Sequence, residues 1–201
     1  MKKIILIGGG GHCNSCIDVI ETEKKFSING IILPKKNSKF IKKYPVIGTD
    51  KDLLNLIKIT PHVLICIGQI KKPQPRKKIF DLLKKGGAKF PVIKSPYSYS
   101  SNYSIIKEGS ILMHGSVVNV NSMIGYNCII NSKSLIEHDV KIGNHSHIST
   151  GAIINGGVSI GEGSFIGSGS VIREGVKIGK YSIIGSGKVI LRDIKDRTII
   201  K

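Results

Sequence analysis

The sequence predicts two consecutive domains: a small parallel α/β domain over residues 1–92, then a parallel β-helix over residues 93–201. Two observations lead to this prediction. Up to about residue 92, short apolar strands alternate with stretches of helical periodicity, as in a parallel α/β unit. From Ile106 onward a six-residue period takes over and never slips, which is typical of a solenoid built from short stacked strands.

The first domain is expected to contain three strands, each followed by a helix. Strands are predicted at residues 4–7, 28–33 and 63–67, and helices at about 15–25, from a capping box at 49–52 through 57, and at 75–83. Gly68 follows the third strand. Ligands of such sheets bind beyond the carboxyl ends of the strands. The glycine run at residues 8–11 therefore lies where a phosphate or a sugar nucleotide would bind.

This glycine run does not match the dinucleotide-binding fingerprint G-x-G-x-x-G. In the two possible alignments, Cys13 or Asn14 stands where the last glycine belongs. The pattern that is present, Gly8-x-x-Gly11-His12, supports two interpretations. Either the backbone approaches an anion at the amino end of a helix, or Gly8 serves a tight turn that needs a positive φ.

Composition indicates an ordinary globular chain, since 40% of its 201 residues are hydrophobic. No apolar run is long enough to span a bilayer, and the amino-terminal one is too short for a signal peptide. We therefore expect a cytoplasmic protein without membrane insertion. The four cysteines form no disulfide framework, which suits a reducing compartment. The single C-x-x-C pair, Cys13 and Cys16, is weak evidence for zinc or redox chemistry.

The net charge of +18 indicates an anionic partner. The positive charge is mostly lysine, scattered along the whole chain, and aromatic residues make up only 5%. No helix-turn-helix signature or aromatic stacking platform is present, so we expect no nucleic-acid partner. Anionic small molecules such as nucleotides or coenzyme A account for the charge equally well.

The hexad repeat determines which side chains face inward. Its first position is Ile, Leu or Val in fourteen consecutive hexads, from Ile106 to Ile184, and its fifth position is Ser, Cys, Ala or Val until Lys188. One large and one small side chain per strand fill a triangular prism, in which three hexads make one coil. At about 4.8 Å per coil the prism is roughly 22 Å tall. Cys128 occupies a fifth position, so we interpret it as a packing residue and not as a nucleophile.

Third hexad positions 18 residues apart stack at one corner of the prism. The His138 corner consists of Val120, His138, Gly156 and Glu174; the serine corner of His114, Ser132, Thr150, Ser168 and Ser186; the Glu162 corner of Glu108, Tyr126, Asn144, Glu162 and Lys180. Gly156 lies one coil above His138, where its missing side chain leaves room and an accessible amide. The small residues of the serine corner would let a narrow chain lie along it.

The cluster Glu137-His138-Asp139 is the turn that suggests chemistry. Ile136 and Ile142 keep the repeat in phase on both sides, so the turn holds these three side chains outward. Neighbouring carboxylates raise the basicity of an imidazole and orient one ring nitrogen, as a general base requires. The Gly156 amide would stabilise an oxyanion. The alternative is a solvated turn histidine.

The glycine run followed by His12, combined with hexads that carry "IEHD", closely resembles one family. These are the left-handed β-helix sugar acetyltransferases, which N-acetylate UDP-4-amino-4,6-dideoxy sugars or O-acetylate sialic acids. The resemblance covers nearly the whole chain. It implies a Rossmann-like domain that binds a nucleotide sugar, and a prism whose left hand departs from the usual crossover rule. It also implies a homotrimer with acetyl-coenzyme A between neighbouring prisms.

The resemblance further implies a role for individual residues. His138 would be the general base for direct attack of the acceptor amine on the thioester, Asp139 would orient it, and His147 would contact the thioester end. The implied acceptor and coenzyme sites are lined by Asn131, Gly156, Ser168 and Ser186, and the nucleotide sugar is held by Gly8, Gly10, Gly11, His12 and Gly68. No metal is implied.

Two stretches depart from the family pattern. The acidic pair that usually ends the second strand is replaced by Leu33-Pro34-Lys35, so the group expected to read the nucleotide is missing. The usual Gly-x-Pro-Ala-Lys tail is replaced by the sequence DRTIIK at residues 196–201. The sequence therefore does not indicate which nucleotide the sugar carries.

Three other functions stay open. One is an O-acetyltransferase that acts on a sialic-acid-like sugar. Another is a metal protein similar to β-helix carbonic anhydrases, with His114, His145 and His147 as ligands, although their hexad positions offer no ligand geometry and His145 is expected at the surface. The third is a non-catalytic scaffold, which leaves the Glu137–Asp139 cluster unexplained.

Overall fold

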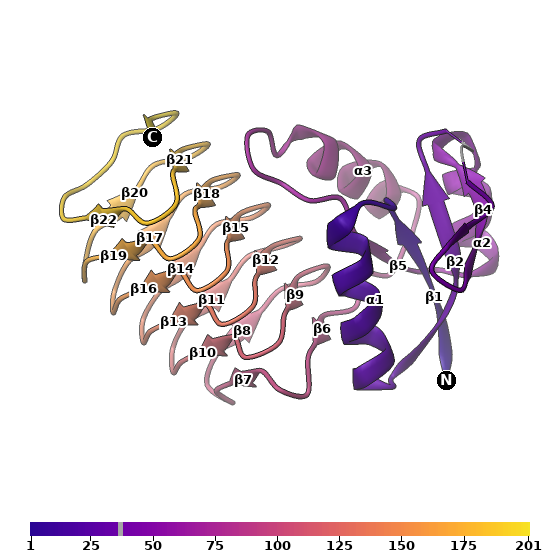
Figure 1. Cartoon of the computed structure of the whole chain (residues 1–201), viewed down its shortest axis with the longest axis horizontal. Helices are drawn as coiled ribbons and strands as arrows, with labels where there is room; N and C mark the ends of the chain where they lie inside the picture. The colour runs from indigo at the N-terminus through magenta and orange to yellow at the C-terminus, as the bar shows by residue number, and fades with distance from the viewer. Residues whose placement is uncertain (36–37) are drawn as a thin grey trace.

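The computed structural model describes residues 1–35 and 38–201, and it places the α/β domain beside a β-helix (Figure 1). The sheet of the first domain has the order β3-β4-β2-β1-β5. Its strands are β1 (Lys2–Ile7), β2 (Phe26–Leu33), β3 (Phe40–Ile41), β4 (Tyr44–Thr49) and β5 (His62–Ile65). All pairings are parallel except that of β3 with β4. The prediction missed β3 and β4, because proline and glycine interrupt the short apolar pattern of β4.

Three helices cover the two faces of this sheet: α1 (Gly11–Glu23), α2 (Leu53–Ile59) and α3 (Gln74–Lys85). Helix α1 lies between the sheet and the β-helix, while α2 and α3 pack on the opposite face (Figure 1). The capping box is confirmed: the Thr49 backbone N–H donates to Asp52 Oδ2 over 2.8 Å at the start of a 3₁₀ turn, η1 (Asp50–Asp52), that leads into α2. Helix α1 begins four residues earlier than predicted, directly after the glycine run.

The second domain is a left-handed parallel β-helix of two-residue strands in three sheets. We name each sheet after its first strand. The β6 face holds β6 (Ile93–Lys94), β9 (Ile111–Leu112), β12 (Ile129–Ile130), β15 (His147–Ile148), β18 (Phe165–Ile166), β21 (Ile183–Ile184) and β23 (Ile199–Ile200); the β7 face holds β7 (Tyr99–Ser100), β10 (Val117–Val118), β13 (Leu135–Ile136), β16 (Ile153–Ile154), β19 (Val171–Ile172) and β22 (Val189–Ile190); the β8 face holds β8 (Ile105–Ile106), β11 (Met123–Ile124), β14 (Lys141–Ile142), β17 (Ser159–Ile160) and β20 (Lys177–Ile178).

The predicted register is confirmed, because paired residues lie 18 apart, as in Ile136 with Ile154. The first and fifth hexad positions face inward, and Cys128 is fully buried there. The buried hydroxyl groups of serines at the fifth position are hydrogen-bonded, and Ser110 is an example. Ser110 Oγ donates to the carbonyl of Gly125 and accepts the N–H of Cys128, so each coil is bonded to the next.

The β6 face joins the two domains. Ile93, Ile111 and Ile129 on this face pack into the same apolar cluster as α1 and the inner strands of the sheet. A polar contact lies beside this cluster, where His114 bonds Asp18 of α1 and Ser95 through its two ring nitrogens, at 2.8 and 2.6 Å. This junction fixes the carboxyl edge of the sheet against one side of the prism. Within residues 1–35 and 38–201, no helix has the length and apolar character needed to cross a membrane.

Candidate active site

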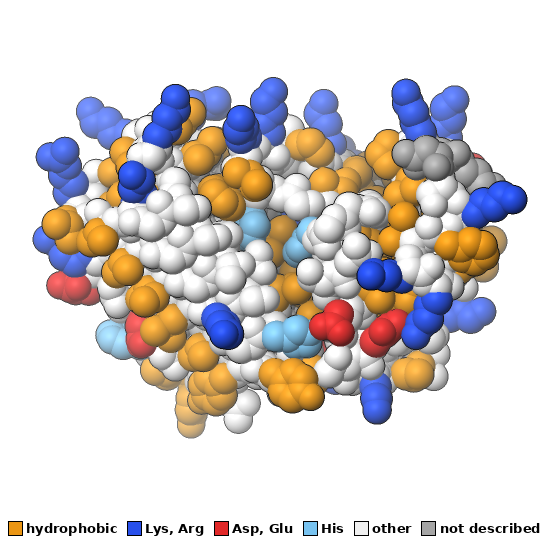
Figure 2. Space-filling view, in the orientation of Figure 1, with side chains coloured by type: hydrophobic (Ala, Val, Ile, Leu, Met, Phe, Trp, Pro, Cys, Tyr) orange, Lys and Arg blue, Asp and Glu red, His pale blue; other side chains and the backbone are white. Residues whose placement is uncertain are grey.

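A cavity of about 1290 Å³ lies between the carboxyl edge of the sheet and the serine corner of the prism. Six of the site residues that the family resemblance implies line it together: His12, Gly68, Asn131, His147, Ser168 and Ser186. The space-filling view shows histidine side chains in the hollow between the two domains (Figure 2). The loop after β5 and residues of β18, β21 and β23 complete its wall.

His147 stands in this wall with a fixed orientation. Its Nδ1 lies 2.6 Å from the carbonyl oxygen of Gln69, and a carbonyl only accepts, so Nδ1 carries a proton. Nε2 then has a free lone pair, which accepts from Asn131 Nδ2 at 3.2 Å. Burial lowers the pKa of His147 to about 4, so the imidazole is neutral at physiological pH. The ring of Phe165 packs edge-on against it, with centroids 5.2 Å apart.

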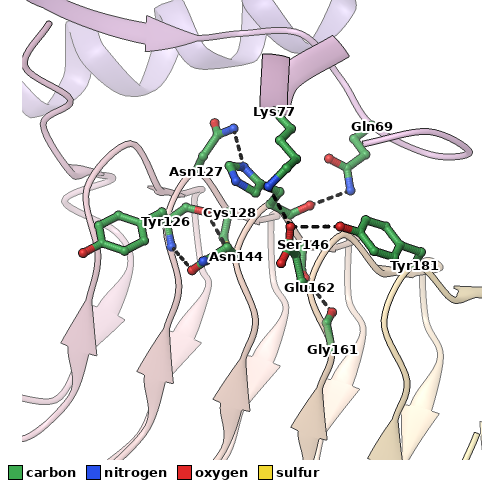
Figure 3. A network of polar contacts seen from close by, with 11 residues as sticks. Gln69, Lys77, Tyr126, Asn127, Cys128, Asn144, Ser146, Gly161, Glu162 and Tyr181 are labelled. Carbon is green, nitrogen blue, oxygen red and sulfur yellow. Dashed lines mark hydrogen bonds and ion pairs between the residues drawn. The ribbon is translucent and has the colours of Figure 1, made fainter. Parts of the chain in front are cut away.

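His145 is buried, and the expectation that it lies on the surface is wrong. Phe80 of helix α3 packs edge-on against its ring, with centroids 5.4 Å apart. Figure 3 shows Lys77 of α3 and Gln69 of the loop after β5 beside the turn that carries Asn144 and Ser146. Gln69 Nε2 donates to the His145 carbonyl over 2.8 Å, and Asn127 Nδ2 lies 3.0 Å from His145 Nδ1. Burial is the main reason that the pKa of His145 falls to about 4, and the nearby Lys77 adds to it. Hexad position alone does not reveal what the first domain covers.

Helix α3 holds this arrangement from the other side. Lys77 forms an ion pair of 2.9 Å with Glu162, whose carboxylate also accepts the hydroxyl of Tyr181 (Figure 3). The fully buried Arg76 donates to the carbonyls of Ile65 and Ile67 and to the side chain of Asn127, each over 2.7 Å. The loop that carries Gly68 and Gln69 is thereby tied to the prism.

The glycine run divides into two parts. Gly8 has φ +105°, and an added Cβ would come within 2.8 Å of Ile67, so the tight-turn interpretation is correct for this residue. A Cβ at Gly10 or Gly11 would meet nothing within 4 Å, and helix α1 begins at Gly11. These two positions leave the amino end of α1 open, as the approach of an anion requires.

His138 and Asp139 form a hydrogen-bonded pair at their own corner of the prism. His138 Nδ1 donates to Asp139 Oδ2 over 2.8 Å, and the imidazole is more than half exposed. A Cβ on Gly156 would come within 2.6 and 2.7 Å of ring atoms Cε1 and Nε2, so the imidazole fills the room that the glycine leaves. Glu137 has a different partner, since Asn119 Nδ2 donates to its carboxylate over 2.9 Å. Of the two carboxylates, Asp139 is therefore the one that is hydrogen-bonded to the imidazole.

The cavity and the His138 corner are separated within one chain. After Asn131, which directly precedes the serine corner, the chain crosses the β7 face as strand β13 and only then reaches His138. Neither His138, Asp139 nor Gly156 lines the cavity. One copy of the chain therefore brings six of the expected binding residues together and leaves the expected base on the far edge of the β7 face.

The β7 face itself is apolar on its outer side. One outward side chain per coil stacks along it in direct register: Tyr99, Val117, Leu135, Ile153, Val171 and Val189. Figure 2 shows hydrophobic side chains gathered along the diagonal where β22 to β7 lie in Figure 1. A continuous apolar column on a protein surface marks a place that another molecule covers.

Sequence reasoning missed Gln69, Phe165 and the lysines that follow Gln69. Gln69 follows Gly68 in the loop after β5, so the rule that ligands bind at the carboxyl edge of a sheet could have pointed to it.

The three histidines of the metal hypothesis bind different partners. His114 contacts Asp18 and Ser95, His145 contacts Asn127, and His147 contacts Gln69 and Asn131. Apart from residues 36 and 37, the chain has no group of three or more potential ligands arranged to hold a metal ion.

Comparison with known proteins gives two family matches. Residues 3–83 match the PglD N-terminal domain, and residues 157–192 match the bacterial transferase hexapeptide of six repeats. A search of the curated proteins gives no significant match.

Solved structures give closer comparisons. The chain is 27% identical to a histidine-to-asparagine variant of perosamine N-acetyltransferase from Caulobacter crescentus in complex with CoA and GDP-perosamine, with 99% of this chain and 93% of that chain covered and a TM-score of 0.93. It is 28% identical to the acetyltransferase domain of PglB from Neisseria gonorrhoeae in complex with acetyl coenzyme A, over 98% and 95% of the two chains, with a TM-score of 0.89. WeeI from Acinetobacter baumannii, at 24% identity and a TM-score of 0.86, shares the fold. The predicted fold and the resemblance to sugar acetyltransferases are confirmed.

Proposed function

We propose that this chain, which resembles sugar acetyltransferases in both of its domains, transfers an acetyl group from acetyl-coenzyme A to the amine of a nucleotide-linked amino sugar. The observation that carries the proposal is the His138–Asp139 pair, held against Gly156 on a scaffold that matches a GDP-perosamine N-acetyltransferase along almost its whole length. A 4-amino-4,6-dideoxy sugar is the acceptor that this resemblance favours.

The geometry of His138 suits a general base. Since Asp139 accepts a hydrogen bond from Nδ1–H, Nε2 keeps its lone pair and is free to take a proton from the acceptor amine. As that proton leaves, the amine nitrogen bonds to the thioester carbonyl carbon, and collapse of the tetrahedral intermediate breaks the carbon–sulfur bond. Coenzyme A leaves as a thiolate and takes up the proton from His138 Nε2, which restores the neutral base. The backbone N–H of Gly156, beside the ring, would stabilise the oxyanion.

The cavity fits the two substrates. A narrow pantetheine chain would lie along the small residues of the serine corner, Ser168 and Ser186, with Lys71 and Lys72 near to pair with phosphates. His147, neutral and fixed by Gln69, would face the thioester end. The nucleotide sugar would lie toward His12, Gly10 and Gly11, with its phosphates at the open amino end of α1.

The active form is proposed to be a homotrimer with the apolar β7 faces turned toward the threefold axis. This face ends in the His138 corner on one side and in the serine corner on the other. Turning it toward the axis brings the His138 corner of each subunit beside the serine corner of the next. A threefold rotation about an axis parallel to the prism keeps every residue at the same level along that axis. Because His138 and Asn131 belong to the same coil, His138 of one subunit would lie at the level of Asn131 of the next. The base of one subunit would thus complete the cavity of its neighbour.

The second candidate is an O-acetyltransferase acting on a sialic-acid-like sugar. The observation that favours it is Leu33-Pro34-Lys35 at the end of β2. The family that the sequence resembles usually carries an acidic pair there, so a UDP-linked acceptor is disfavoured. The same base and the same cavity would serve a hydroxyl acceptor.

A thiol-release assay tests the proposal. Purified protein and acetyl-coenzyme A are combined with amino sugars linked to UDP, GDP or CMP, and with hydroxyl acceptors in parallel. We expect release with at least one nucleotide-linked amino sugar, and release only with hydroxyl acceptors would support the second candidate. His138→Ala is expected to reduce release by more than 100-fold, with Glu174→Ala at the same corner as the control. Retained turnover in His138→Ala would remove the assignment.

A further inference from the structure

Helix α1 carries a thiol directly behind one of the cavity histidines. Cys16 lies one helical turn after His12 on the same face of the helix, and its Sγ is 3.5 Å from Nε2 of that ring. His12 lines the cavity and is half-buried, whereas Cys16 is fully buried in the apolar cluster beneath it. The imidazole therefore connects the core of the first domain with the cavity, and the proposed acetyl transfer uses no thiol of this chain.

We propose that Cys16 is a positioning residue for the acceptor: its thiol binds Nε2 of His12 and so presents Nδ1–H to the diphosphate of the nucleotide sugar. The inference rests on the proposed function, and it adds a residue that acts through His12 without touching either substrate.

The thiol determines which ring nitrogen carries a proton. An S–H group that donates to Nε2 needs a lone pair there, so the proton of the neutral imidazole lies on Nδ1. If the shared proton moves from sulfur to the ring, a thiolate–imidazolium pair results, and Nδ1 keeps its own proton. Nδ1 is thus a donor in both forms. Within residues 1–35 and 38–201 it has no partner, so it is available to a phosphate oxygen.

The ring needs this contact because the other neighbours do not select its orientation. An added Cβ on Gly68 would lie 3.7 Å from Cβ of His12, so the loop after β5 passes close to the base of the side chain only. A half-turn of the ring about the Cβ–Cγ bond would put Cδ2 in the place of Nδ1, where no strong donor would face the phosphate. The same half-turn would replace Nε2 by Cε1 beside the thiol. Cys16 therefore stabilises the productive orientation and not the reversed one.

Cys13 offers a matched control on the same helix. Its thiol is also fully buried and belongs to the same apolar cluster as that of Cys16. Among the residues that the structure describes, the hydrogen bond to His12 comes from Cys16 and not from Cys13. Cys13→Ala and Cys16→Ala thus remove the same group from similar surroundings, and both introduce the residue with the best helix propensity. Only the second change deprives His12 of its partner.

Steady-state kinetics of the full-length protein test the proposal, with acetyl-coenzyme A and with UDP-linked and GDP-linked 4-amino-4,6-dideoxyglucose as acceptors. Cys16→Ala should raise the acceptor KM about 5- to 10-fold, as the loss of one hydrogen bond to a charged group would, and leave kcat and the KM of acetyl-coenzyme A unchanged. Cys13→Ala should leave all three values unchanged. Cys16→Ser keeps a donor and should bring the acceptor KM back toward the wild-type value. An acceptor KM that stays normal in Cys16→Ala, or rises equally in Cys13→Ala, would overturn the proposal.

A double-mutant cycle separates positioning from a structural effect. In His12→Ala, the additional change Cys16→Ala should raise the acceptor KM no further, because the ring through which it acts is gone. A further rise in that background would show that Cys16 acts on the fold and not through His12.

The tautomer can also be measured without any substrate. In ¹⁵N NMR of histidine-labelled protein, the His12 signals are identified by their absence from His12→Ala, and we expect them to show a protonated Nδ1. An unprotonated Nδ1 in the wild type would contradict the assignment. His138→Ala is run alongside in the kinetic assay. If it is inactive while Cys16→Ala is normal, only the role of Cys16 fails, whereas an active His138→Ala removes the proposed function itself.

Discussion

His147 donates its Nδ1–H to the carbonyl oxygen of Gln69 over 2.6 Å, and this bond joins the prism to the loop that follows β5. It fixes the tautomer of a buried histidine, because Nε2 is left to accept from Asn131. Gln69 reaches the prism a second time through its side chain, which donates to the His145 carbonyl. The orientation of one cavity side chain is therefore set by both domains together, and several predictions depend on how they are joined.

Gly156→Ala should disable the enzyme without unfolding it. The new methyl group would come within 2.6 Å of His138 Cε1, and the exposed imidazole yields more easily than the backbone. A base displaced by about 1 Å costs about 100-fold in rate. We expect kcat to fall by that order while the melting temperature changes by no more than a few degrees. Glu174→Ala, one coil higher, is the control, and a Gly156→Ala protein with near-normal kcat would contradict the packing described.

Ile153→Asp should break the proposed trimer. Ile153 stands in the middle of the apolar column on the β7 face, between Leu135 and Val171. A carboxylate buried there in a trimer would lack any partner, which is strongly unfavourable. Light scattering coupled to gel filtration should show monomers, and thiol release should be lost with them. Lys141→Asp changes an outward side chain on the β8 face and should leave the trimer intact. A trimeric, active Ile153→Asp would show that another face forms the contact.

Folding stability should fall as the pH drops from 6.5 toward 4. His145 and His147 both titrate near pH 4 when folded, against about 6.5 when unfolded, so the unfolded chain takes up protons first. The stabilisation that they contribute is complete above pH 6.5 and is lost as the pH falls from 6.5 to 4. The loss is about 3 kcal/mol for each histidine. Urea unfolding at pH 7 and pH 5 measures the loss.

His145→Asn is the matched variant for this pH dependence. Asparagine tolerates the positive φ of His145, as Asn127 does one coil below, but it does not titrate. The difference in unfolding free energy between pH 7 and pH 5 should shrink in this variant. An unchanged slope would mean that His145 is not protonated on unfolding.

Arg76→Ala should be severely destabilising. The guanidinium is buried and donates to the carbonyls of Ile65 and Ile67 and to Asn127, and burial lowers its pKa only to about 10, so it stays charged. Removing it leaves several buried acceptors without a donor, at a cost of about 3–5 kcal/mol. Denaturant unfolding measures this cost. Lys78→Ala, on the exposed side of the same helix, should cost less than 1 kcal/mol.

The repeat made the prism predictable in detail. Position within a hexad determines which side chains face inward. The spacing of 18 residues per coil is enough to predict that His138 lies under Gly156, as it does in the structure. The local sequence pattern also predicted helix α3 and the capping box of Thr49, because both depend on residues close in sequence.

The junction was not predictable in the same way. Burial of His145 depends on α3 and on the loop after β5, which lie more than 60 residues earlier in the chain. Position within a hexad shows whether a side chain points into the prism, but it says nothing about what packs outside. Gln69 was missed for the same reason, since its importance comes entirely from partners on another domain.

The 18-residue register also limits how such a chain can change in length. An insertion of one or two residues inside a coil would turn inward side chains outward in every strand above it, unless it bulged from a corner. Gain or loss of a whole coil keeps every face intact and moves the parts above it by one strand spacing, about 4.8 Å. The prism therefore changes length in fixed steps of one coil. A coil added above residue 190 would lengthen the serine corner without moving His138 from the level of Asn131.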